Sequence, residues 1–342
     1  MVGSLNLSSA TDLLLRARSG MPQSLGISLP EAANLSSPIA PQPLDAIEFE
    51  FGLFQSRLDC SYLYNDELNS CHLTLTLPDK PPVDSSGYPV MVWFNGGGFM
   101  IGSAAWPQYN PSKMAAVAAQ NGRPTIIISV NYRVGIFGNM ASHDLLEDAK
   151  SHGQEGTGNQ GLRDQQTALK WVQKNIKGFG GDPSKVTIFG ESAGSASCNA
   201  HMVAPSSAKL FSRAILESGT VTMVSAFPLD FQDVLYQGLL KKFNITGSTA
   251  KERVEAFKNL PLDTIFQALT PAHPHRPTAD GYFLDWVPTF ADIENKNPRL
   301  FPEFMDACMF GCTKDDVLPL FVILISGFHL RNHAERKRNG NY

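Results

Sequence analysis

A serine flanked by glycines is the part of this sequence that could carry nucleophilic chemistry. The run VTIFGESAGSAS places an apolar strand directly before Gly190-Glu191-Ser192-Ala193-Gly194, and small residues that can begin a helix follow. In this context G-x-S-x-G holds the serine on a sharp turn, so that its hydroxyl stands clear of the sheet. A bare motif of this kind also occurs by chance. The flanking strand and helix therefore carry the prediction that Ser192 is a nucleophile.

A run of three glycines provides a second chemical element. Gly96, Gly97 and Gly98 follow the apolar run at 90–95, at the point where a strand should end. Backbone N–H groups with no side chains in the way can donate to the oxygen that becomes negative when an ester carbonyl is attacked. We therefore predict an oxyanion hole formed by the N–H groups of Gly97, Gly98 and Ala193. A flexible glycine turn is the alternative interpretation.

Alternating strands and helices could hold these two elements. The apolar runs that predict buried parallel strands lie at 90–95, 125–133, 186–190, 213–219 and 307–311. Between the second and third runs, Leu169, Val172 and Ile176 share one stripe of an amphipathic helix, which gives a right-handed strand, helix and strand crossover. Further helices at 230–243 and 251–260 should lie over one end of the sheet. This pattern predicts an α/β protein.

Composition and patterning exclude several functions. The 342 residues are 43% hydrophobic and carry a formal charge of -4, so we expect no nucleic-acid partner. The amino-terminal apolar run at 13–15 is too short for a signal peptide, which predicts a cytoplasmic protein by default. The longest apolar stretch, 318–328, contains Pro319 and is too short to span a bilayer. The five cysteines include no CxxC pair, and we expect no metal site.

Four segments of the chain resemble the type-B carboxylesterase/lipase family, which includes cholinesterases and fungal lipases. They are FNGGGFMIGSA, IIISVNYRVGIFG, GNQGLRDQQTALKWVQKNIKGFGGDPSKVTIFGESAGS and LFSRAILESG. The close resemblance covers residues 88–220, and a weaker one extends to about residue 316. It implies an α/β-hydrolase fold, with a mostly parallel central sheet and helices on both faces. It also implies hydrolysis of a small-molecule carboxylic ester through a serine acyl-enzyme, without a cofactor.

The resemblance further implies a triad of serine, acid and histidine. The acid of the family falls on Asp316 in Lys314-Asp315-Asp316, one methylene shorter than the usual glutamate, and Val317 replaces the usual glycine. A solvated acidic turn is the alternative interpretation of these residues. We predict that Asp316 is the catalytic acid.

The base is harder to place in this sequence. In α/β-hydrolases the histidine follows the acid along the chain, and only His329 and His333 follow Asp316. His329 comes so soon after Asp316 that a helix and a strand do not fit between them. We therefore expect a fungal-type member that is truncated at both ends, stops before the family's histidine and has an incomplete carboxyl-terminal part. His329 as a substitute base is the alternative interpretation.

Several other matches to the family have structural interpretations. Arg133 and Asp164 correspond to a buried ion pair that ties the sheet to its crossover helix. His201, on the helix after Ser192, is predicted to be a packing residue. Cys60 and Cys71 lie near the family's amino-terminal disulfide, but the text around Cys71 departs from the family pattern, which puts the pairing in doubt.

The sequence thus predicts a serine carboxylesterase with lipid or secondary-metabolite esters as candidate substrates. The alternative is a non-catalytic, esterase-like binding protein or an inactive truncated product. We divide the chain into an irregular lead-in at 1–58, an incomplete α/β-hydrolase domain at 59–320 and a polar tail outside the family pattern at 321–342.

Overall fold

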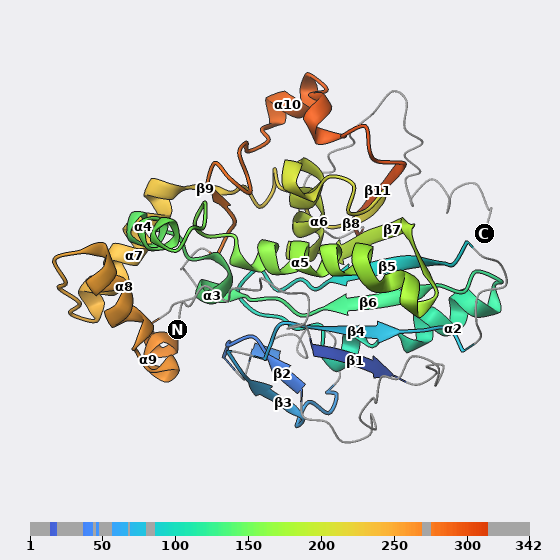
Figure 1. The fold of residues 1–342 in the computed structure, drawn as a ribbon, viewed down its shortest axis with the longest axis horizontal. Coiled ribbons are helices and arrows are strands. Elements are labelled where there is room, and N and C mark those ends of the chain that lie inside the picture. Colours follow the sequence, from blue (N-terminus) through green and yellow to red (C-terminus); the bar gives the residue numbers. More distant parts are fainter. Residues whose placement is uncertain are drawn as a thin grey trace.

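The computed structural model describes residues 14–18, 37–43, 46–47, 57–67, 69–79, 86–268 and 275–313. In this part of the chain a seven-stranded sheet forms the centre of the molecule, in the order β1-β4-β6-β5-β7-β8-β11 (Figure 1). Its strands are β1 (Leu14–Arg18), β4 (His72–Thr76), β5 (Tyr88–Phe94), β6 (Ile126–Val130), β7 (Gly181–Glu191), β8 (Arg213–Glu217) and β11 (Ala307–Gly311). The strands from β6 to β11 run parallel, whereas β4 runs antiparallel to β6 and parallel to β1. The predicted mostly parallel sheet is confirmed.

The central strands are apolar because the layers on their faces exclude water. Every residue of β6 is buried, and β5 alternates between buried and half-buried residues. The strand predicted at 186–190 is the carboxyl-terminal half of β7, which begins earlier, at Gly181. Strands of this kind bring their carboxyl ends to one edge of the sheet, which is where the chemistry predicted from the sequence should lie.

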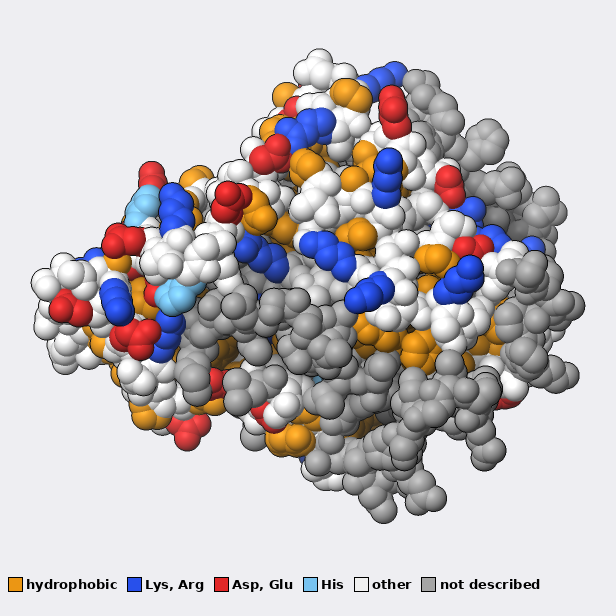
Figure 2. Space-filling model, viewed as in Figure 1, with side chains coloured by type: hydrophobic (Ala, Val, Ile, Leu, Met, Phe, Trp, Pro, Cys, Tyr) orange, Lys and Arg blue, Asp and Glu red, His pale blue; other side chains and the backbone are white. Residues whose placement is uncertain are grey.

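Two helices pack against the middle of the sheet. They are α5 (Gln160–Asn175) and α6 (Ala193–Val203), and both contact β7. The predicted stripe of Leu169, Val172 and Ile176 is fully buried against the sheet. The opposite face of α5 carries the exposed Lys170 and Lys174. Figure 2 shows basic side chains in a row across the middle of the molecule, where Figure 1 places this helix.

A helical lobe lies beyond one end of the sheet, at the left of Figure 1. It contains α4 (His143–Ser151), α7 (Leu229–Lys242), α8 (Ala250–Lys258) and α9 (Leu262–Ala268), so the two predicted helices are close to α7 and α8. α4 and α8 are joined by a two-pronged ion pair, in which Arg253 donates from Nε and Nη2 to Asp144 at 2.6 Å each. Lys258 and Asp148 add a second pair at 3.2 Å.

The amino-terminal region contains regular structure where the sequence predicts none. Within 1–58, β1 adds to the sheet beside β4, and β2 (Ser37–Ile39) pairs with β3 (Leu63–Asn65). All three residues of β2 are buried. Strands this short show no periodic pattern, because the partner strand and not the local sequence selects them. The boundaries at residues 58 and 320 stay predictions.

The remaining elements connect these layers. They are α2 (Ser112–Gln120), α3 (Gly135–Asn139), α10 (Phe290–Glu294), the paired β9 (Phe227–Pro228) and β10 (Thr278–Ala279), and short 3-10 helices at Pro107–Tyr109, Ile176–Phe179, Pro205–Ser207 and Pro298–Leu300. Among the helices of the described ranges, none has the length and apolar character needed to cross a membrane.

Candidate active site

Ser192 lies at the predicted turn between a strand and a helix. β7 ends at Glu191 and α6 begins at Ala193, and the serine between them has φ 54° and ψ -119°. Non-glycine residues rarely adopt a positive φ, and such a conformation costs about 1–3 kcal/mol unless its surroundings hold it. Here the Ser192 N–H donates to the Glu217 carbonyl at 2.8 Å, and the Ser192 carbonyl accepts from Ala196 at 2.9 Å. The sheet and the helix together hold the strained turn.

The glycines on either side of Ser192 are required by close backbone approach. A Cβ on Gly190 would lie 2.5 Å from the carbonyl carbon of Gly194, and one on Gly194 would collide with the carbonyl oxygen of Phe94. The first contact is with the helix and the second is with the neighbouring strand β5. The serine turn, residues 190–194, is therefore defined by backbone packing.

The glycine loop, residues 95–102, lies at the same sheet edge as Ser192. Phe94 at the end of β5 pairs with Gly190 of β7, so the two strands end side by side. A Cβ on Gly96 would lie 3.3 Å from the Ser192 Cβ. Gly97 and Gly98 have φ values of 110° and 64°, and a Cβ on Gly98 would meet open space. Convergence of the Gly97, Gly98 and Ala193 amides on one point stays a prediction.

Buried polar side chains donate hydrogen bonds to carbonyl groups of the glycine loop. The Tyr132 hydroxyl donates to the Asn95 carbonyl at 2.6 Å, and burial raises the Tyr132 pKa above its ordinary value. The Phe99 carbonyl accepts two hydrogen bonds, from the Gly135 N–H at 2.7 Å and from Asn139 Nδ2 at 3.2 Å. The sequence singles out neither Tyr132 nor Asn139 for this role, although both lie within or beside the family-like text after β6.

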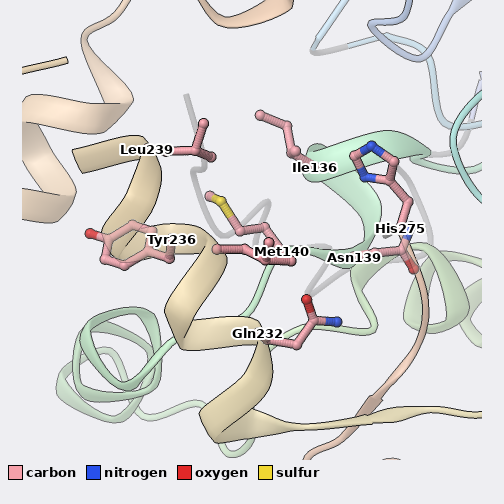
Figure 3. Close-up of a pocket in the computed structure, with 8 residues that line it drawn as sticks. Ile136, Asn139, Met140, Gln232, Tyr236, Leu239 and His275 are labelled. Atoms are coloured by element: carbon pink, nitrogen blue, oxygen red, sulfur yellow. The ribbon is translucent and has the colours of Figure 1, made fainter. Parts of the chain in front are cut away.

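A small pocket lies between α3 and α7, and Asn139 is one of its lining residues. Figure 3 shows Ile136 and Asn139 of α3 and the adjoining Met140 facing Gln232 and Tyr236 of α7. It has room for about one water molecule. Ser192 is not among its lining residues, so this pocket is not the substrate cleft.

His201 supports the helix that follows Ser192. It is fully buried, and burial lowers its pKa from 6.5 to about 3, so the ring is neutral. Its Nε2 donates to Gln165 Oε1 at 3.0 Å and its Nδ1 accepts from the Ser207 hydroxyl at 2.9 Å. Gln165 in turn donates to Ser197 at 3.2 Å, and the Ser197 hydroxyl donates to the Ala193 carbonyl at 2.8 Å. The predicted packing role of His201 is confirmed.

The ion pair implied by the family resemblance is present. Arg133 donates to Asp164 from Nε at 2.8 Å and from Nη2 at 2.7 Å, which ties the end of β6 to α5. The buried Cys71 thiol donates to the same carboxylate at 3.5 Å, and burial raises its pKa. No disulfide joins Cys60 and Cys71.

The predicted acid and the candidate bases lie outside the described residues. Asp316, His329 and His333 all follow residue 313, where the description ends. Among the residues that the structure does describe, no histidine is hydrogen-bonded to the Ser192 hydroxyl. The serine turn and the glycine loop are therefore the two parts of the predicted constellation that the structure brings together.

Comparisons with known proteins agree with this geometry. The chain is 37% identical over 251 residues to Lipase 2 of Diutina rugosa, covering 68% of this chain and 43% of that protein. It is 39% identical over 182 residues to para-nitrobenzyl esterase of Bacillus subtilis, covering 53% of this chain and 32% of that esterase. It is 44% identical over 149 residues to the cholinesterase of Mus musculus, covering 44% of this chain and 22% of that protein.

The solved structures that resemble this chain are also esterases. A PNB esterase matches with a TM-score of 0.63 and 28% identity, covering 82% of this chain and 52% of that chain. A carboxylesterase of Geobacillus stearothermophilus matches with a TM-score of 0.60 and 29% identity, covering 76% and 50%. The chain thus spans about half the length of these structures and less than half of the curated relatives. The sequence model of the family described as "Carboxylesterase family" matches residues 38–341, which is most of the chain. This protein therefore belongs to the carboxylesterase family.

Proposed function

We propose that this protein is a carboxylic ester hydrolase in which Ser192 forms a covalent acyl-enzyme. The observation that carries the proposal is the strained φ of 54° at Ser192, on a turn that adjoins the glycine loop. A backbone strained in this way persists where the surrounding structure holds it, and such residues cluster at active sites. Membership of the carboxylesterase family supports the same chemistry.

The reaction proceeds in two steps in this proposal. The Ser192 oxygen attacks the ester carbonyl carbon, and the N–H groups of Gly97, Gly98 and Ala193 donate to the oxyanion of the tetrahedral intermediate. The intermediate collapses, the alcohol leaves with a proton, and the acyl group remains on Ser192. Water then attacks the acyl-enzyme, releasing the carboxylic acid and restoring the hydroxyl. Asp316 orients the base that takes the serine proton, and His329 is the first base to test.

The substrate class follows from the surroundings of the serine turn. Ala193 belongs to an apolar cluster that also contains Phe99, Val221, Phe283 and Leu284. A buried apolar cluster next to the serine turn disfavours a charged acyl group there and favours an aliphatic one. We propose esters of lipids or of other apolar acids as substrates, and a series of p-nitrophenyl esters of increasing acyl length tests this.

A fluorophosphonate probe and p-nitrophenyl butyrate test the proposal together. Ser192→Ala should abolish labelling and remove the hydrolysis that depends on the serine nucleophile. Ser184→Ala is the matched control, because Ser184 is an exposed serine near the other end of β7 and should leave both signals unchanged.

The proposed acid is tested beside its neighbour in the sequence. Asp316→Asn should lower kcat by up to about 10⁴-fold, because the base is then held in the wrong tautomer. Asp315→Asn should leave kcat unchanged. Labelling that survives Ser192→Ala would refute the assignment of the nucleophile. Reversible binding of the probe without labelling or turnover would point instead to an esterase-like binding protein.

A further inference from the structure

The amino-terminal segment reaches the glycine loop through one buried side chain. Gln42, which is 1% exposed, accepts a hydrogen bond from the Gly102 N–H through Oε1 at 2.8 Å. Its Nε2 donates to the Gly102 carbonyl at 3.0 Å and to the Ala40 carbonyl at 3.1 Å. One amide group thus satisfies both backbone groups of Gly102, and this pattern requires a donor and an acceptor on the same side chain.

The backbone of Gln42 is itself held in place. Asn65, at the end of β3, accepts from the Gln42 N–H through Oδ1 at 3.3 Å and donates from Nδ2 to the Gln42 carbonyl at 2.7 Å. The same reciprocal arrangement therefore occurs twice in series, from Asn65 to Gln42 and from Gln42 to Gly102. Such a chain of satisfied buried hydrogen bonds fixes the position of Gly102 relative to the paired strands β2 and β3.

Gly102 transmits that position to the part of the loop that adjoins Ser192. Its φ is 114°, and a Cβ there would collide with Asn95 Nδ2 and with the Gly96 carbonyl oxygen. The Gly97 carbonyl accepts from Met100 at 3.0 Å and from Ile101, the residue before Gly102, at 3.1 Å. Gly102 therefore packs directly against the Asn95–Gly96 segment, and Gly96 in turn lies against Ser192.

We infer that Gln42 is a positioning residue for the oxyanion hole, acting through the backbone of Gly102. This inference rests on the proposed esterase function for its kinetic consequence, although the positioning itself does not. Oxyanion donors stabilise the transition state only if they are aimed before the reaction begins, and a displacement of about 1 Å can cost about 100-fold in rate. Nothing in the sequence around Gln42 indicates this role, because the contact joins residues 60 positions apart.

Two substitutions separate positioning from mere packing. Gln42→Met keeps the volume but removes all three hydrogen bonds, and we expect kcat for p-nitrophenyl butyrate to fall about 10- to 100-fold with little change in KM. Gln173→Met is the matched control. Gln173 also donates to two backbone carbonyls, those of Pro183 at 2.8 Å and Leu210 at 2.9 Å, but these lie away from the glycine loop. It should leave kcat unchanged.

Gln42→Glu gives a signature that a packing role does not produce. An ionised carboxylate accepts from the Gly102 N–H but cannot donate to the Gly102 carbonyl, whereas a protonated one can do both. The rate of Gln42→Glu relative to the unaltered protein should therefore rise as the pH falls from about 8 to about 5, since burial raises the pKa of a carboxyl group. Cys60 is the titratable group among the residues that line the pocket beside Gln42, so the ratio is also measured with Cys60→Ala.

Hydrogen exchange distinguishes failure of this inference from failure of the proposed function. Gln42→Met should speed exchange of the amides in 95–102 at least about 10-fold, and Gln173→Met should not, whether or not the protein turns over esters. If Gln42→Met speeds exchange but the protein has no esterase activity, the proposed function is refuted and the positioning role of Gln42 is supported. Unchanged exchange, an unchanged kcat in an active protein, or a flat pH ratio for Gln42→Glu would overturn the inference.

Discussion

Around Ser192 the backbone is held by uncharged, buried groups, whereas in the helical lobe it is held by ion pairs and helix caps. The glycine loop accepts hydrogen bonds from the Tyr132 hydroxyl and the Asn139 amide. In the lobe, Arg253 pairs with Asp144, and Thr249 caps α8 with a complete capping box. The lobe is stabilised by partly exposed side chains, so water can take over some of their hydrogen bonds when one of them is removed. The serine turn is stabilised by backbone contacts that leave no room for adjustment.

The largest difference between the two regions should come from adding a single methyl group to a glycine. Gly194→Ala should lower the free energy of unfolding by about 3 kcal/mol, the upper end for overpacking, because the new Cβ meets the immobile Phe94 carbonyl. Gly238→Ala should instead raise it by about 0.5–1 kcal/mol, because Gly238 is exposed within α7 and a Cβ there meets nothing. Urea denaturation measures both. Equal effects of the two substitutions would contradict the comparison.

Acid should weaken the serine side of the molecule through His201. Its folded pKa of about 3 lies below its ordinary 6.5, so the unfolded chain binds a proton first as the pH falls. Stability should therefore be lost between pH 6.5 and about 3, by about 1 kcal/mol for each pH unit from this group.

The control for this effect is an exposed histidine near the lobe. His201→Gln should flatten the dependence of the unfolding free energy on pH over that range, even if it lowers stability at neutral pH. His152→Gln removes an imidazole that is 58% exposed and serves as the matched substitution. A slope that His201→Gln does not alter would show that this ring takes up a proton in the folded state as readily as in the unfolded chain.

The smallest effect should come from the ion pair of the lobe. Arg253→Met should lower the free energy of unfolding by about 1–2 kcal/mol, because water screens the Arg253 side chain, which is 25% exposed, but less so that of Asp144, which is 9% exposed and loses its partner. The ester turnover should stay the same, since Asp144 and Arg253 lie in the lobe and not in the serine turn. Lys251→Met, on the exposed part of the same helix, serves as the control. A matching loss of turnover in Arg253→Met would mean that the lobe and the site are coupled.

The sequence predicts the central sheet well because the central strands are apolar in their own right. The runs at 90–95, 125–133 and 213–219 correspond closely to β5, β6 and β8, and the stripe around Leu169 corresponds to α5. The serine turn is predictable for a related reason, since its glycines are needed by contacts with adjacent chain elements. Family resemblance supplies the rest of that prediction.

The supports of the site are not predictable in the same way. Gln42 stands in a proline-rich run without periodicity, and its partner Gly102 is 60 residues away. Tyr132 and Asn139 are polar residues whose value depends on which carbonyl groups the fold places beside them. A single sequence shows local conformational preferences but not contacts between residues that are far apart in the chain. The glycine loop could therefore be predicted, whereas the residues that hold it could not.

The contact between Gln42 and Gly102 also bears on how the protein folds. Strands β6, β5, β7 and β8 are neighbours in the sheet and come from one continuous stretch of chain, Tyr88–Glu217. Within that stretch Phe94 of β5 pairs with Gly190 of β7, 96 positions later in the chain, whereas the contact between Gln42 and Gly102 closes 60 positions. Loop closure costs entropy, and contacts between distant residues delay folding. Gln42 and Gly102 are both made before β7 (Gly181–Glu191), so in a newly made chain the anchor of the glycine loop should be able to form before the strand that precedes Ser192 joins the sheet.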